Sequence, residues 1–246
     1  MNPKAYEEMA RVQDTHWWYV ARRAILRSVL TTLRLPPDAD ILEIGCGTGA
    51  NLPVLGEFAR VVGLEMSPEA IGHALRTANG RGDISLVEGR CPQDLAKLTQ
   101  RFDLICLLDV LEHLDQDANC LARLRPLLKP NGKVLIMVPA YRWMWGPHDV
   151  YHHHRRRYDR RSLALACDHG GFDVRRMCHF NTVLFPLAVL GRMYEKLTGL
   201  RSAATQLPAA PLNRLLTLVF AWERRLIARW SVPVGLSLLA VAAPRS

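Results

Sequence analysis

Residues 146–161, GPHDVYHHHRRRYDRR, gather side chains that can do chemistry, because these sixteen positions hold four histidines and five arginines. An imidazole accepts and donates protons near neutral pH, and a guanidinium holds a carboxylate or phosphate through paired hydrogen bonds. The same residue types suit a metal site, a nucleic-acid patch, a solvated charge run or an active site. The elements that position the stretch must decide among these four.

A metal site and a nucleic-acid patch are both disfavoured by the surrounding sequence. His152, His153 and His154 are consecutive and cannot converge on one ion from a regular element, and no cysteine or second carboxylate lies at a good spacing. Residues 35–141 carry ten Lys and Arg against fourteen Asp and Glu, so they offer no continuous basic surface. We therefore expect no metal and no nucleic-acid partner, while a plain charge run stays open as an alternative.

The segment ILEIGCGTG places Gly45, Gly47 and Gly49 directly after an apolar strand and before a helix. Glycines allow a tight turn whose bare backbone a ligand can approach at the carboxyl edge of a sheet. Their GxGxG spacing does not match the GxGxxG fingerprint of dinucleotide-binding loops. The next strand, in ARVVGLEMS, ends in Glu65, where a carboxylate can accept both hydroxyls of a ribose.

Strands and helices alternate along most of the chain, which predicts a parallel sheet covered by helices on both faces. Helices are expected over 3–34, 93–100, 115–128 and 160–170. The predicted strands lie in ADILEI, ARVVGLE, ISLVEG, FDLICLLDV, GKVLIMVP, FDVRRMCHF and VGLSLLAVAAP. The stretch 146–161 follows the fifth of these strands, at the edge where ligands bind in such sheets.

Three motifs in this order, LEIGCGTG, VVGLEMS and FDLICLLDVLEHL, resemble those of the class I S-adenosylmethionine-dependent methyltransferases. The resemblance implies S-adenosylmethionine as cofactor and S-adenosylhomocysteine as product. It implies that the loop of Gly45, Gly47 and Gly49 contacts the methionine half of the cofactor and that Glu43 supports this loop. It also implies that Glu65, followed by Met66, holds the ribose and that Asp109 lies near the transferred methyl. Arg90 stands where many members have an acidic residue, so backbone groups near Arg90 and Cys91 are expected to recognise the adenine.

Two tryptophans and two arginines lie ahead of the core, in DTHWWYVARRAI. Similar segments precede the core in methyltransferases of the ubiquinone O-methylating type, where the leading helix closes over the cofactor. By that resemblance Trp18 and Arg22 are candidate cofactor contacts. A helix that simply packs on the sheet is an equally good interpretation, since exposed tryptophan is costly.

Methyl transfer from a sulfonium is an in-line displacement that needs an aligned, deprotonated nucleophile. A histidine can remove the proton of a hydroxyl nucleophile, with a carboxylate fixing its tautomer, whereas an anionic nucleophile needs only arginines to position it. A bacterial subgroup associated with polyprenol-linked sugars or glycolipids has a similar HD and H-x-R-R-Y pattern. The candidate catalytic residues are His148, Asp149 and His154, and the candidate substrate-binding residues are Arg156, Arg157, Tyr158, His113 and Tyr141.

Residues 182–232 replace a connection that is a short hairpin turn in the usual plan of this superfamily. We therefore expect this long insertion to have a specific function. They hold seven Lys and Arg against two Glu and are expected to form two helices around LPAAPLN. In the second helix an apolar stripe is expected from Leu215, Val219, Trp222, Leu226 and Trp230. Such a stripe beside arginines suits an anionic membrane surface, but also a dimer interface or a packed helix.

We expect one domain over 1–246 with a Rossmann-like, doubly wound α/β fold and a seven-stranded sheet. Its expected parts are an N-terminal helical cap (1–37), a core (38–181) with a substrate loop (140–161), a helical insertion (182–232) and the last strand (233–246). The composition, 49% hydrophobic and 22% charged, is that of an ordinary globular protein. Six cysteines without a CxxC pair indicate reduced thiols.

The sequence predicts a cytoplasmic protein, peripheral on the inner face of the membrane if the insertion binds lipid. Residues 1–20 lack the apolar core of a secretory signal, and the longest uncharged stretch, 231–244, is too short to span a bilayer. The predicted function is O-methylation of an apolar or lipid-linked anionic acceptor. A soluble aromatic or quinone-like acceptor, and a catalytically silent or RNA-binding relative, are the alternatives, and the oligomeric state stays open.

Overall fold

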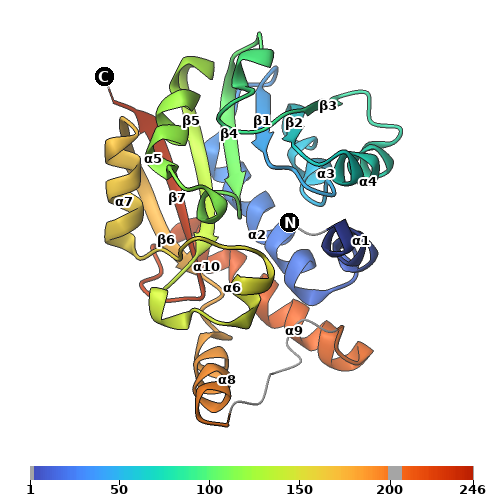
Figure 1. The fold of residues 1–246 in the computed structure, drawn as a ribbon, viewed down its shortest axis with the longest axis vertical. Coiled ribbons are helices and arrows are strands. Elements are labelled where there is room, and N and C mark those ends of the chain that lie inside the picture. The colour runs from blue at the N-terminus through green and yellow to red at the C-terminus, as the bar shows by residue number, and fades with distance from the viewer. Residues whose placement is uncertain (1–2, 199–206, 246) are drawn as a thin grey trace.

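The computed structural model describes residues 3–198 and 207–245 (Figure 1). Residues 1–2 of the expected cap, 199–206 of the expected insertion and 246 of the expected last strand lie outside the described part.

Seven strands form one sheet, as the sequence predicts, in the order β3-β2-β1-β4-β5-β7-β6, and the sheet is mixed rather than wholly parallel. The pairs from β3 through β5 are parallel, while β7 runs antiparallel between β5 and β6. The carboxyl ends of the parallel strands therefore share one edge, where ligands bind in this class of sheet. The strands are β1 (Asp40–Ile44), β2 (Arg60–Glu65), β3 (Ile84–Glu88), β4 (Phe102–Leu108), β5 (Leu128–Pro139), β6 (Phe172–Phe180) and β7 (Ser237–Pro244).

Two apolar clusters, one on each face, hold helices against the sheet. Alternate residues of β4 divide between them: Ile105 and Leu107 face one cluster, Leu104 and Cys106 the other. The first cluster includes α5 (Asp117–Leu124) and α7 (Arg160–His169). The second includes α2 (Trp17–Leu33), α3 (Leu52–Leu55), α4 (Pro68–Ala78), α9 (Ala210–Trp222) and α10 (Arg224–Arg229). Figure 1 shows the resulting three layers.

The N-terminal helix predicted over 3–34 is two helices, α1 (Pro3–Val12) and α2, so that prediction was wrong in detail. The ring of His16 caps α2 by accepting from the backbone N of Trp18 at 3.2 Å. Gln13, in the break, is buried and accepts from the Thr48 hydroxyl through Oε1. Buried polar contacts therefore outweigh the helical pattern at this joint.

The prediction of a helix over 93–100 is also wrong, because only a single 3-10 turn, Leu95–Lys97, forms there. A cis bond between Cys91 and Pro92 precedes it. The loop after β5 contains two short elements that the sequence did not indicate, a 3-10 turn at Arg142–Met144 and α6 (Pro147–Tyr151). A further 3-10 turn, Leu111–His113, follows β4, and another, Arg125–Leu127, precedes β5.

The described part of the insertion, 182–198 and 207–232, has three helices rather than the two predicted: α8 (Phe185–Thr198), α9 and α10. The predicted stripe fails because the helix breaks at Glu223, which is buried and accepts from the backbone N of Thr182 and Val183 at 2.9 and 2.8 Å. Phe220 and Ile227 face the core instead, and α8 buries none of its residues. Within the described residues, no helix combines the length and the apolar character needed to cross a membrane.

Candidate active site

The glycine loop follows β1 at the carboxyl edge of the sheet. Gly45, Gly47 and Gly49 all have positive φ values, of 64°, 55° and 82°, a conformation that favours glycine. A Cβ on Gly45 would lie 2.8 Å from a methyl group of Val110, whereas a Cβ on Gly47 would meet nothing within 4 Å. The loop thus presents bare backbone to open space of the kind that a ligand fills.

Glu65, at the end of β2, lies beside this loop and is almost fully buried. Its Oε2 accepts from the backbone N of Gly47 at 2.9 Å, and its Oε1 accepts from that of Ser67 at 3.0 Å. A carboxylate offers about four acceptor positions, so Glu65 keeps capacity to accept from a ribose hydroxyl. Tyr6 of α1 packs here too: burial first, and then the Glu65 charge, raises the pKa of its phenol.

A cavity of about 400 Å³ lies along the ends of β2 and β3, where the resemblance places the adenine. Arg90 lines it, and its backbone N donates to Asp94 Oδ2 at 2.8 Å. Cys91 is turned toward α5, with its Sγ 2.9 Å from that of Cys120. The cavity is lined by Met66, Glu88, Gly89, Arg90, Gln93, Asp94 and Lys97.

Asp109 follows β4 with a φ of 59° and pairs with Arg22 of α2. Arg22 Nη2 lies 2.6 Å from Asp109 Oδ2, and Nη1 donates to Oδ1 at 3.1 Å. The guanidinium carbon of Arg22 lies 5.3 Å from the ring centroids of both Trp18 and Phe180, within cation–π range. The cap helix therefore reaches the carboxylate predicted to lie near the transferred methyl.

Glu43, inside β1, is buried with one oxygen unsatisfied. Its Oε1 accepts from Asn51 at 2.9 Å, while its Oε2 has no hydrogen-bond partner among the described residues. Burial raises the pKa of Glu43 to about 8. An orphaned carboxylate oxygen under the glycine loop suits an ammonium group delivered by a ligand.

Glu43 also predicts how stability depends on pH. The folded protein keeps the Glu43 proton up to about pH 8, whereas the unfolded chain loses it above about 4.5. The native state therefore binds more protons in this window, so this group makes stability fall as pH rises through it. Between about pH 5 and pH 8, the unfolding free energy of the wild type is expected to fall by roughly 2–4 kcal/mol more than that of Glu43→Gln. Urea titrations at each pH measure both values. Glu88→Gln, which changes an exposed glutamate, is the control and should follow the wild type. Equal losses of unfolding free energy in the wild type and in Glu43→Gln would contradict this prediction.

Histidines from two segments meet beside Asp109. The ring centroids of His113 and His154 are 4.8 Å apart, those of His148 and His152 are 4.3 Å apart, and those of His148 and His154 are 6.0 Å apart. Burial, reinforced by the neighbouring His154, lowers the pKa of His152 to about 4, while the nearby Asp109 carboxylate acts to raise it. The loop after β5 thus meets the turn after β4 at the methyl-transfer edge.

Asp149 anchors this histidine cluster from within the protein. Its fully buried carboxylate accepts from the backbone N of Gly146 at 2.8 Å and from Arg157 Nε at 2.7 Å, and lies 2.9 Å from His154 Nδ1. Burial acts to raise the pKa of Asp149, but the hydrogen bonds from His154 and Arg157 outweigh it and hold the pKa well below its usual range. The contact with Asp149 engages Nδ1 of His154 and leaves Nε2 as the ring nitrogen that a ligand can reach.

Arg156, Arg157 and Tyr158, predicted to bind substrate, contact protein groups instead. Arg156 donates to Asp117 Oδ2 at 3.0 Å and Arg157 to Asp149, while buried Tyr158 donates to Asp117 at 2.7 Å. These bonds tie the loop to α5 and to itself. We therefore interpret the three residues as positioning residues, a change from the predicted anion clamp.

Tyr141 also belongs to a packing cluster. It has a φ of 62° and stacks on His179 of β6, with ring centroids 5.4 Å apart and planes 13° apart, and it contacts Phe185 of α8. Among described residues that sequence reasoning missed, Tyr6, Gln13 and Glu112 lie at the site; none has a local sequence signal, because burial and distant partners single them out.

Comparisons with known proteins agree with this geometry. Residues 17–176 match the family model described as a methyltransferase domain. The ubiquinone biosynthesis O-methyltransferase of Coxiella burnetii is 27% identical over 139 residues, which cover 52% of this chain and 59% of that protein. The chain therefore matches less than two thirds of this relative's length.

Solved structures share the fold. A Haloferax volcanii methyltransferase in complex with the Trm112 activator has a TM-score of 0.60 at 20% identity, covering 99% of this chain and 96% of that chain. A Geobacter sulfurreducens S-adenosylmethionine-dependent methyltransferase in complex with S-adenosylhomocysteine has a TM-score of 0.53 at 18% identity, covering 90% of both chains.

Proposed function

Because this chain belongs to the class I S-adenosylmethionine-dependent methyltransferases, we propose that it methylates an oxygen of an apolar or lipid-linked anionic acceptor at a membrane surface. The cofactor supplies a methyl group on a sulfonium, and S-adenosylhomocysteine is the product. The proposed location is the inner face of the cytoplasmic membrane, and polyprenyl-linked sugars or glycolipids are the proposed acceptor class.

The chain's own residues suit each part of the cofactor. Gly47 and its neighbours would approach the methionine half, with the orphaned Glu43 oxygen available to the ammonium. Glu65 would hold the ribose. The cavity beside Arg90 would take the adenine, against which the half-exposed Met66 would pack.

One observation carries the acceptor proposal: α8 and α9 leave apolar side chains in solvent at the edge that holds the site. Figure 1 shows both helices projecting beyond the ends of the parallel strands, on the side of α6. Lys196 of α8 donates to the carbonyl oxygen of Trp143 at 3.0 Å, which joins this apolar surface to the histidine loop. The exposed residues are Leu187, Leu190, Met193, Tyr194 and Leu197 on α8, and Leu212, Leu215, Leu218 and Trp222 on α9. A surface of this kind marks a membrane or partner contact.

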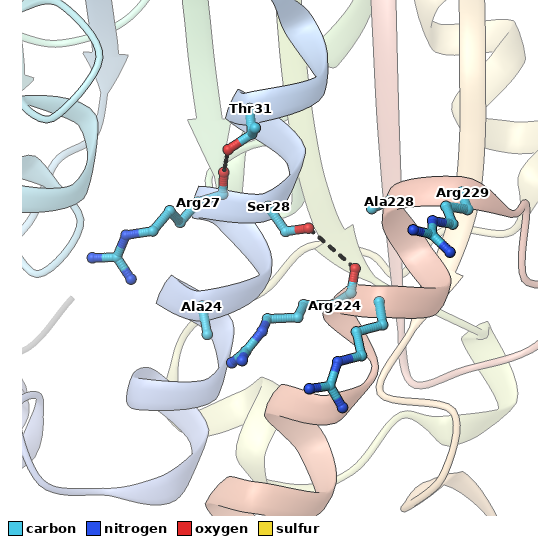
Figure 2. A pocket seen from close by; sticks show the side chains of 8 residues that line it. Ala24, Arg27, Ser28, Thr31, Arg224, Ala228 and Arg229 are labelled. Atoms are coloured by element: carbon cyan, nitrogen blue, oxygen red, sulfur yellow. Dashed lines mark hydrogen bonds between the residues drawn. The ribbon is translucent and has the colours of Figure 1, made fainter.

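Charge favours an anionic membrane as the occupant. A groove of about 820 Å³ runs between α2 and α10, and Figure 2 shows its arginines beside Ser28 and Thr31 of α2. Arg224, Arg225 and Arg229 line it without a carboxylate partner among the described residues, while Arg27 pairs with Glu57. Arginines beside exposed Trp222 and Trp230 match the headgroup level of an anionic bilayer.

The transfer itself is proposed to use His154 and Asp149. The acceptor oxygen loses its proton and attacks the methyl carbon, the carbon–sulfur bond breaks, and its electron pair stays on sulfur. Asp149 contacts Nδ1 of the His154 ring, so Nε2 would be the nitrogen that takes the proton from the acceptor. His148 and His152 line the same cluster and complete its polar wall.

Vesicle binding tests the membrane proposal. Replacing Arg224, Arg225 and Arg229 together by glutamine is expected to weaken binding to anionic phospholipid vesicles about 100-fold, since each surface arginine contributes about 1 kcal/mol. The measurement is co-sedimentation with phosphatidylglycerol vesicles over a range of salt. The control removes three exposed arginines elsewhere, Arg101, Arg123 and Arg161, with the same change in net charge.

Equal weakening in both triple variants would contradict a dedicated surface. The proposal would also be contradicted if the wild type did not bind vesicles and eluted as a stable dimer. In that case α8 and α9 of one copy would cover those of the other.

A soluble quinone-like acceptor is the second candidate, favoured by the name of the Coxiella burnetii relative. It predicts methyl transfer to a phenolic hydroxyl without vesicles present. The two candidates differ in the fraction, aqueous or lipid, that receives the methyl group.

A further inference from the structure

Glu112 is a fully buried carboxylate that the methyl-transfer scheme leaves unused. It lies in the 3-10 turn after β4, and neither of its oxygens has a hydrogen-bond partner among the described residues. A buried carboxylate without a hydrogen-bond partner calls for an explanation, and a bound cation is one.

Two imidazoles face this carboxylate. One ligand atom from each of Glu112, His113 and His154 lies within 4.8 Å of the other two. His113 is adjacent in sequence, whereas His154 comes from the loop after β5, so the fold brings this set together. Zinc ligands sit about 2.0–2.1 Å from the ion, so shifts of about 1 Å would close the set around one.

His154 is already oriented as a metal ligand. Its Nδ1 lies 2.9 Å from Asp149 Oδ1, and Arg157 and the Gly146 backbone donate to the same carboxylate. This arrangement leaves Nε2 free and repeats the carboxylate–histidine pairing found behind metal-bound imidazoles. A lone base would use the same pair, but it would not explain the orphaned Glu112 or the placement of His113.

We propose that Glu112, His113 and His154 bind one divalent transition-metal ion, Zn²⁺ by preference. Two imidazoles and one carboxylate suit Zn²⁺ better than Mg²⁺ or Ca²⁺, which take oxygen ligands. Three protein ligands leave an open position, the pattern of catalytic rather than structural zinc sites. This proposal replaces the sequence-based expectation of no metal.

The role of the ion rests on the proposed function. At the open position it would polarise the acceptor hydroxyl and lower its pKa, so that the proton leaves to a neighbouring imidazole or to water. The oxygen then attacks the methyl carbon and the sulfur keeps the electron pair, so the ion undergoes no redox change. His154 would then act on the acceptor through the ion rather than as a free base.

Metal binding is measured with Zn²⁺ alone, by calorimetry on chelator-stripped protein. The wild type is expected to bind one equivalent, and Glu112→Gln and His154→Gln are each expected to weaken binding at least 100-fold. His153→Gln, which changes the exposed neighbour, is the control and should match the wild type. Circular dichroism checks that each variant folds, and two ligand variants guard against the failure of one.

Absence of saturable Zn²⁺ binding in the wild type overturns the metal proposal, as does tight binding that survives both ligand variants. Binding of S-adenosylhomocysteine is titrated into the same samples. Cofactor binding without Zn²⁺ binding overturns only the metal site, whereas Zn²⁺ binding without cofactor binding overturns the proposed function and leaves the metal site standing.

Discussion

Replacing Gly47 by leucine is expected to abolish binding of S-adenosylhomocysteine, with a dissociation constant raised at least 100-fold. A Cβ at this position meets nothing within 4 Å, so the longer side chain would extend from the loop into the space assigned to the methionine half of the cofactor. Isothermal titration calorimetry measures the loss. The φ of 55° also costs a side chain about 1–2 kcal/mol of stability.

Gly80 offers a matched control for that strain. It has a φ of 78° and open space at its Cβ, but it lies in the loop between α4 and β3. Gly80→Leu should lower the melting temperature about as much as Gly47→Leu while leaving the dissociation constant unchanged. Normal cofactor affinity in Gly47→Leu would place the methionine half elsewhere.

Replacing His154 by alanine is expected to lower the rate of methyl transfer 10²- to 10⁴-fold, the usual range for a group that handles the reacting proton. Cofactor affinity should stay within about twofold, since His154 contacts Asp149 and His113 rather than the glycine loop. Single-turnover transfer of a labelled methyl group separates the chemical step from binding.

His153→Ala is the control for this experiment, because the neighbouring residue is exposed and changes the same residue type. Its rate should equal that of the wild type. Equal losses in both variants would assign the stretch a general electrostatic role and remove His154 from the reaction.

The sheet could be predicted because each parallel strand is an apolar run bounded by turn residues. The residues at the ends of those runs, Gly47, Glu65 and Asp109, are therefore brought to one edge by topology alone. The same logic brings the histidine stretch to that edge. Local sequence, together with the strand order, thus suffices to bring these residues to one edge of the sheet.

The failures share a physical cause, which is that burial depends on distant partners. The pattern over 3–34 is helical, yet buried Gln13 bonds Thr48 and breaks it. Glu223 interrupts the apolar stripe predicted for the second helix of the insertion, because its carboxylate accepts from the backbone N of Thr182. The spacing of apolar residues in the sequence does not indicate either contact.

The protein partners of the arginine-rich stretch could not be predicted for a related reason. Arg156 and Tyr158 share Asp117, a residue some forty positions earlier in the chain. Their donors satisfy protein carboxylates, so the local excess of positive charge is smaller than composition suggests. Glu112 was overlooked because an acidic residue after a strand carries no sign of being buried and unpaired.

The most direct test incubates the enzyme with methyl-labelled S-adenosylmethionine and vesicles made from a bacterial lipid extract, and then separates lipid from aqueous fractions. We expect label in the lipid fraction, lost with Gly47→Leu and strongly reduced with His154→Ala. Label confined to the aqueous fraction, or transfer that both variants retain, would contradict it.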